Sequence, residues 1–199
     1  FYIASFLLGA LGAWIIARFG RKLRLIDKPS ERSSHSETMP KGGGIGILIV
    51  LLFGALWWHM PGSLWIPACI VSLVSLLADY RDVSFKIRLV VQVSWAAIFS
   101  GCLYFRISAL EVSLAISILL FIFGVLFLTA TANYYNFMDG INGIAGLTGV
   151  IAFSFFGLYG LFEGKNSSWV AMAFGIAVAC LGFLPLNFPK AKVFMGDVG

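Results

Sequence analysis

Polar residues recur at every third position between two strongly apolar segments of the chain. They are Asn133, Asn136, Asp139 and Asn142. On a helix, residues three apart are turned by about 60° from one another, so the four side chains share one half of the helix surface. The segment contains no lysine or arginine to neutralise Asp139. Because ionisable groups between membrane-depth apolar segments are costly, this polar face predicts a functional site, although Asp139-Gly140 would also fit a simple turn.

A second stretch whose residues could bind a ligand is Lys41-Gly42-Gly43-Gly44, which directly precedes an apolar run. Glycines at the start of a helix leave backbone N–H groups and the positive end of the helix dipole accessible to an anion. The stretch therefore predicts a phosphate-binding loop with Lys41, Gly42 and Gly43 as contacts. A solvated basic loop followed by small residues for close helix packing would explain the same residues.

Carboxylates occur at two further places. Asp79 and Asp82 follow an apolar run, and Asp197 stands after a glycine with two lysines a few residues upstream. Such carboxylates can bind Mg²⁺ or accept a proton. Ion pairs with nearby arginines and lysines, or a surface turn, are the alternative explanations.

The elements that must position these groups are apolar helices. Of the 199 residues, 60% are hydrophobic and 12% are charged, whereas soluble domains carry roughly 25% charged residues. A helix needs about 20 apolar residues to cross a bilayer. The composition predicts an all-α, polytopic transmembrane helical bundle that forms a single domain over residues 1–199. Its seven or so spans are expected at 1–19, 42–58, 64–78, 89–105, 112–132, 143–162 and 169–186.

The basic residues indicate which loops share a side of the membrane. If the spans alternate, 12 of the 14 lysines and arginines lie on one side, and Arg106 and Lys165 lie on the other. The positive-inside rule makes the basic side cytoplasmic. All of the polar motifs fall on this side, so four carboxylates can converge on one site at the membrane boundary: Asp79, Asp82, Asp139 and Asp197. This combination of carboxylates, a glycine-rich helix start and surplus cations suits Mg²⁺-assisted phosphoryl transfer to a lipid phosphate. The net charge of +5, placed on the cytoplasmic loops, favours membrane lipids rather than nucleic acid as partners.

At these motifs the chain resembles the polyprenyl-phosphate N-acetylhexosamine-1-phosphate transferase family of membrane enzymes. Arg32-Ser33-Ser34-His35-Ser36 and Pro40-Lys41-Gly42-Gly43-Gly44 are similar to the first loop of the branch that initiates O-antigen synthesis. Residues 133–143 resemble the family's Asn-rich Asp-Gly motif, and Val193-Phe194-Met195-Gly196-Asp197 resembles its Phe-Met-Gly-Asp motif.

The resemblance implies transfer of an N-acetylhexosamine 1-phosphate from a UDP-N-acetylhexosamine to undecaprenyl phosphate, with release of UMP and Mg²⁺ as cofactor. It places this reaction at the cytoplasmic face of the bacterial inner membrane, as the first step of an O-antigen-like polysaccharide. Asp197 would ligate Mg²⁺, and Asn136, Asp139 and Asn142 would hold the nucleotide or the metal. Asp79 would lie near the lipid phosphate as its base. We therefore expect Asp79 and Asp139 as catalytic residues, and substrate contacts from His35, Lys41, Gly42, Gly43, Asn133, Asn136 and Asn142.

Two features depart from the family pattern. Ala78 aligns with the first member of the family's Asp-Asp pair, which leaves Asp79 as the second member. The resemblance also stops after Gly199, before the family's later spans and its His-rich loop. We therefore expect the chain to be the N-terminal and central part of a longer enzyme, inactive by itself.

A secondary transporter or a flippase component is the alternative function. Transporters place their polar groups near the bilayer midplane on broken helices and often contain repeated halves. Here the carboxylates stand at the ends of apolar runs and the sequence shows no internal repeat. These features favour the enzyme.

The predicted topology can be tested by labelling a single cysteine in the first basic loop. A cysteine replacing Ser36 in a cysteine-free background should resist membrane-impermeant reagents applied to sealed cells, because that loop is expected to be cytoplasmic. Efficient labelling from outside would overturn both the topology and the shared cytoplasmic site.

Overall fold

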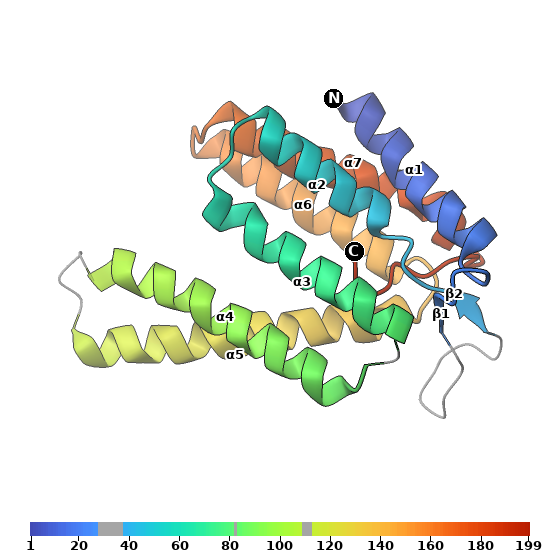
Figure 1. Ribbon diagram of the computed structural model, residues 1–199. Coiled ribbons are helices and arrows are strands. Elements are labelled where there is room, and N and C mark those ends of the chain that lie inside the picture. Colours follow the sequence, from blue (N-terminus) through green and yellow to red (C-terminus); the bar gives the residue numbers. More distant parts are fainter. Residues whose placement is uncertain (28–37, 82, 109–112) are drawn as a thin grey trace. The chain divides into compact units, whose positions relative to one another are not determined.

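The computed structural model describes residues 1–27, 38–81, 83–108 and 113–199. Within them it has seven helices and one two-stranded antiparallel sheet (Figure 1). The elements are α1 (Tyr2–Phe19), β1 (Ile26–Asp27), β2 (Met39–Pro40), α2 (Ile45–Trp57), α3 (Gly62–Arg81), α4 (Phe85–Ser108), α5 (Leu114–Asp139), α6 (Ile144–Phe162) and α7 (Ser167–Asn187). The predicted all-α fold is confirmed.

Five helices of the described residues, α1, α4, α5, α6 and α7, are long and apolar enough to cross a membrane, and α2 is a shorter apolar helix. Large apolar side chains are exposed along them: on α5, Leu119 is 65%, Phe123 64% and Leu126 65% exposed. Such surfaces are stable in lipid and not in water. The protein is therefore a multi-pass membrane protein, while seven complete crossings stay a prediction.

Helix α5 is longer than the predicted span, which ended at residue 132. It has 26 residues and ends at Asp139, so its length of about 39 Å exceeds the roughly 30 Å of a bilayer core. The polar residues Asn133 and Asn136 are therefore helical, as their spacing predicted. The expectation that Asn142 shares their helix face is wrong, because α5 ends at Asp139 and Asn142 lies in the turn before α6. The extra turns bring Asp139 to the end of the helix.

The described chain divides into two compact units. The first comprises Phe1–Asp82 and Met138–Gly199, and the second comprises Val83–Phe137. In the first unit, α7 packs against α1, α2 and α6. In the second unit, α4 and α5 lie beside each other, with Ser100 of α4 against Gly124 of α5.

The helices of the first unit approach so closely that side chains are excluded at several contacts. A Cβ atom at Gly9 of α1 would stand 2.0 Å from the carbonyl oxygen of Ala179 in α7. A Cβ atom at Gly182 would stand 2.1 Å from the oxygen of Phe6, and one at Gly46 would stand 2.2 Å from the oxygen of Leu8. Small residues at such crossings allow the backbone contact that drives helix association in membranes.

The close contact predicts opposite effects for two Gly→Ala substitutions. Gly9→Ala should lower the free energy of unfolding by about 1–3 kcal/mol, because the new methyl group meets a backbone carbonyl that cannot move aside cheaply. Gly101→Ala is the matched control. A Cβ there meets Phe121 only at 3.9 Å, so the higher helix propensity of alanine should leave stability unchanged or raise it by up to about 1 kcal/mol. Thermal unfolding of both variants in detergent measures the difference, and equal midpoints would contradict the packing.

Candidate active site

The C-terminal segment, residues 193 to 197, runs beside the glycine-rich loop that precedes α2. The backbone N–H of Phe194 donates to the oxygen of Pro40 over 2.8 Å. In return, the N–H of Gly43 donates to the oxygen of Phe194 and that of Gly44 to the oxygen of Met195, each over 2.9 Å. Two motifs from opposite ends of the chain are thereby joined through their backbones.

On its other side the C-terminal segment contacts the α5–α6 turn. The carboxylate of Asp139 accepts two hydrogen bonds, at Oδ1 from the N–H of Met195 over 2.9 Å and at Oδ2 from the N–H of Gly196 over 2.6 Å. Asp139 itself is only 6% exposed. The Asn-rich motif and the Phe-Met-Gly-Asp motif therefore meet directly, as the shared-site prediction required.

Asn187, at the end of α7, is a site-building residue that sequence analysis missed. It is fully buried, its Oδ1 accepts from the N–H of Gly143 over 2.9 Å, and its Nδ2 donates to the oxygen of Val193 over 3.0 Å. Gly143 has a φ of +80°, which favours glycine. An asparagine closing an otherwise apolar run was the available signal in the sequence.

The glycines of the predicted phosphate loop serve close approach in this structure. Gly42, Gly43 and Gly44 are buried. A Cβ at Gly43 would stand 2.9 Å from the side chains of Phe183 and Val193, and one at Gly44 would stand 2.3 Å from the Cα of Gly199. Since the amides of Gly43 and Gly44 donate to the C-terminal segment, substrate binding by Gly42 and Gly43 stays a prediction.

Asp79, at the end of α3, forms an ion pair with Lys41. The distance from Lys41 Nζ to Asp79 Oδ1 is 2.9 Å, and the side chains are 17% and 1% exposed, respectively. The ion pairs expected from the sequence involve arginines and lysines close to Asp79 in the chain, whereas Lys41 belongs to the glycine-rich loop. Lys41, predicted to bind phosphate, and Asp79, the candidate base, are therefore in direct contact.

Gly196 brings the C-terminal segment against this ion pair. Its φ is +71°, in the left-handed region, and a Cβ there would stand 2.5 Å from the nitrogen of Gly42 and 3.3 Å from Oδ2 of Asp79. Only glycine fits this conformation and spacing without strain. The site therefore unites Lys41, Asp79, Asp139 and the residue before Asp197.

The remaining predicted residues lie in different surroundings. Nδ2 of Asn133 donates to Oε1 of Gln92 and to the oxygen of Thr129, both over 2.8 Å, which binds α5 to α4 within the second unit. Asn136 is exposed on α5, and Asn142 is exposed and donates from Nδ2 to the oxygen of Pro189 over 3.1 Å. His35 and Asp82 lie outside the described residues.

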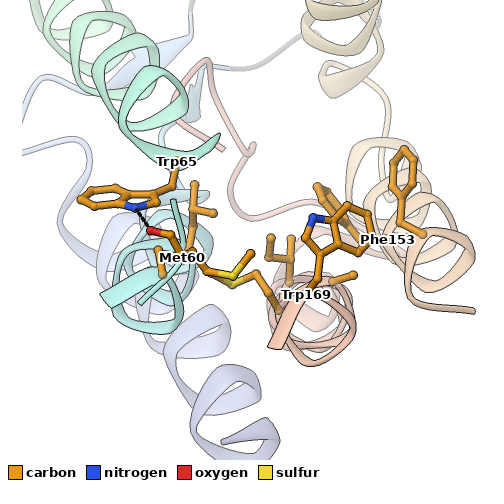
Figure 2. Close-up of a pocket in the computed structure, with 10 residues that line it drawn as sticks. Met60, Trp65, Phe153 and Trp169 are labelled. Atoms are coloured by element: carbon orange, nitrogen blue, oxygen red, sulfur yellow. Dashed lines mark hydrogen bonds between the residues drawn. The ribbon is translucent and has the colours of Figure 1, made fainter. Parts of the chain in front are cut away.

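A separate cavity of about 250 Å³ lies among α2, α3, α6 and α7 (Figure 2). Its lining is apolar and includes Phe153, Trp169 and Met172, and the indole N–H of Trp65 donates to the oxygen of Met60 over 3.2 Å. None of the described residues that line it carries a charge that could serve phosphoryl transfer. The polar cluster, and not this cavity, is therefore the candidate active site.

Residues 61–199 match the family model described as glycosyl transferase family 4. The chain belongs to this family. The matched residues of this glycosyl transferase family 4 chain include Asp79, Asp139 and Asp197. The match confirms the predicted family, while the O-antigen branch stays a prediction.

Several curated relatives are similar to this family member over nearly all of its length. The undecaprenyl-phosphate alpha-N-acetylglucosaminyl 1-phosphate transferase of Thermotoga maritima is 31% identical, over 93% of the chain and 55% of the relative. The probable undecaprenyl-phosphate N-acetylglucosaminyl 1-phosphate transferase of Bacillus subtilis is 29% identical, over 100% of the chain and 58% of the relative. The Escherichia coli K12 transferase is 28% identical, over 99% and 57%. The chain thus spans a little over half the length of these relatives.

The Lys41–Asp79 pair predicts non-additive effects on stability. Asp79→Asn and Lys41→Met should each lower the free energy of unfolding by about 2–3 kcal/mol, because each leaves a largely buried charge without its partner; the partial exposure of Lys41 reduces the loss. The double variant should lose less than the sum of the two by about 1 kcal/mol or more. Chemical or thermal unfolding in detergent gives the comparison, and strict additivity would argue against the ion pair.

Proposed function

We propose that the full-length protein transfers an N-acetylhexosamine 1-phosphate from a UDP-sugar to undecaprenyl phosphate and releases UMP. In this reaction an oxygen of the lipid phosphate bonds to the β-phosphorus of the donor, and the bond from that phosphorus to the bridging oxygen breaks. The observation that carries the proposal is the convergence of Lys41, Asp79, Asp139 and the Asp197 segment at one end of the first unit. Membership of glycosyl transferase family 4 and the names of the relatives support it.

In this proposal the chain's own residues bind and orient two anionic substrates. The ammonium group of Lys41 supplies positive charge beside the C-terminal segment, where phosphate oxygens would otherwise repel one another and nearby carboxylates. Asp79, held at Lys41, is the candidate to receive a proton from the lipid phosphate. Asn142, exposed in the first unit, is a candidate to contact the nucleotide, and a nucleotide contact from Asn136 stays a prediction of the motif alone.

Mg²⁺ is the proposed cofactor, and the donor set fits an ion held largely by its substrate. The described residues contain no group of three or more His, Cys, Asp or Glu placed to hold a metal. Asp79 pairs with Lys41 and Asp139 accepts two amide hydrogen bonds, whereas Asp197 is only partly buried. Mg²⁺ commonly binds one or two carboxylates together with substrate phosphates. Bound through Asp197, it would neutralise charge that develops on the diphosphate.

We further propose that the reaction takes place at the cytoplasmic face of the bacterial inner membrane and starts an O-antigen-like polysaccharide. The excess of lysine and arginine on the loops that carry the motifs supports this orientation. The similarity of residues 32–36 and 40–44 to the O-antigen initiating branch supports the choice of product.

The deciding experiment measures transfer of radiolabel from a UDP-N-acetylhexosamine to undecaprenyl phosphate in membranes containing the full-length protein. Asp197→Asn should lower turnover by about 100-fold or more, because the amide keeps the shape of the side chain but loses the charge that would hold a hard cation. Glu163→Gln, at the exposed far end of α6, is the matched control and should leave turnover unchanged. Near-normal turnover of Asp197→Asn across a Mg²⁺ titration would remove Asp197 from the metal site. Absence of product with every UDP-N-acetylhexosamine would favour the transporter alternative.

A further inference from the structure

Both carboxylate oxygens of Asp139 are engaged by the backbone directly before Asp197. The N–H groups of Met195 and Gly196 are consecutive and converge on this one side chain, over 2.9 and 2.6 Å. Successive amides that turn through a left-handed residue, here Gly196 with a φ of +71°, form a concave anion-binding nest. Asp139 occupies this nest.

We infer that Asp139 is a positioning residue that orients Asp197 and does not itself contact substrate or metal. The inference rests on the proposed function for the role of Asp197. It revises the role that the motif suggested for Asp139, because a buried carboxylate with an amide donor at each oxygen is already engaged within the protein.

The surroundings of Asp139 show why a charged side chain is held there. Asp139 is the last residue of α5, where the negative end of the helix dipole disfavours a carboxylate, and the charges of Asp197 and Asp27 also act on it. Hydrogen bonds from two amides to an ionised acceptor offset this repulsion and are stronger than bonds to a neutral one. The two amide hydrogen bonds therefore hold a carboxylate at an otherwise unfavourable location.

The restraint reaches Asp197 through a single rigid residue. Gly196 is held by Asp139 at its N–H and is closely packed against the backbone of Gly42, where a Cβ would meet the nitrogen at 2.5 Å. Asp197 follows immediately and is only partly buried. A small rotation of this backbone would turn its side chain away from the site, and displacements of about 1 Å can cost about 100-fold in rate.

The first test measures amide hydrogen exchange in the full-length protein without Mg²⁺ or substrates. In Asp139→Asn, one oxygen can still accept, but the NH₂ group faces an amide donor. Exchange at Met195 and Gly196 should therefore quicken by roughly 10-fold or more, while Asp197→Asn, the control that removes a neighbouring carboxylate, should exchange like the parent. Unchanged exchange in Asp139→Asn would overturn the inference, whether or not the protein proves to be a transferase.

Should Asp139→Asn fail to fold, Asp139→Glu is the second variant. This variant keeps an ionised carboxylate as acceptor. The amide exchange rates of Met195 and Gly196 should therefore stay closer to those of the parent than to those of a peptide of the same sequence. Peptide-like exchange in a folded Asp139→Glu protein would show that the carboxylate does not hold the segment.

The second test separates positioning from a general loss of structure. Asp139→Asn should lower kcat by about 10-fold to 100-fold and raise the Mg²⁺ concentration for half-maximal activity, with the KM for undecaprenyl phosphate within about two-fold of the parent. In an Asp197→Asn background, Asp139→Asn should cost at most about two-fold more, because the group it orients is already lost. A full additional loss there would mean that Asp139 acts independently of Asp197.

Discussion

The site depends on one constraint. The backbone of residues 193–196, which is buried up to Met195 and partly buried at Gly196, must find hydrogen-bond partners within the protein. On one side, the N–H of Phe194 donates to the oxygen of Pro40. The oxygens of Phe194 and Met195 accept from the N–H groups of Gly43 and Gly44. Asn187 and Asp139 satisfy the oxygen of Val193 and the N–H groups of Met195 and Gly196 from the other. Unpaired buried backbone groups are costly, so the glycine-rich loop, the α5–α6 turn and the end of α7 are tied together by the needs of one short segment.

Close backbone approach is the second requirement, and it links the membrane helices to the site. Gly9 and Gly46 let α1 contact α7 and the start of α2 without intervening side chains. In the same way, glycines let the loop before α2 and the C-terminal segment approach each other closely: Gly43, Gly44 and Gly196. Because α2 begins and α7 ends at the polar cluster, the close packing of these helices fixes where its hydrogen-bonding groups lie. The apolar outer faces remain available to lipid, so the polar chemistry collects at the helix ends.

Charge is balanced within the cluster by different means at each carboxylate. Asp79 is paired with the ammonium group of Lys41, and Asp139 is stabilised by two amides. Asp197 lies at the partly exposed edge, where a substrate could reach it. This division explains how three acidic residues are accommodated near one another. Asp139 holds the C-terminal segment, Asp79 is proposed as the base, and Asp197 is proposed to hold the metal. In this glycosyl transferase family 4 chain, the motifs thus build one another's structure.

The sequence by itself determined the helices, the membrane character and the family, because apolar run length and local motifs are properties of contiguous residues. Spacing also predicted that Asn133, Asn136 and Asp139 would share a helix, and the common sidedness of the motifs predicted their convergence. Which groups meet was decided only by the tertiary structure. Four contacts join segments far apart in the chain: Lys41 with Asp79, Asp139 with the amides of Met195 and Gly196, Asn187 with Gly143, and Asn133 with Gln92. Hydrogen-bond geometry depends on how closely the helices pack, and that distance is set by the small residues at their crossings.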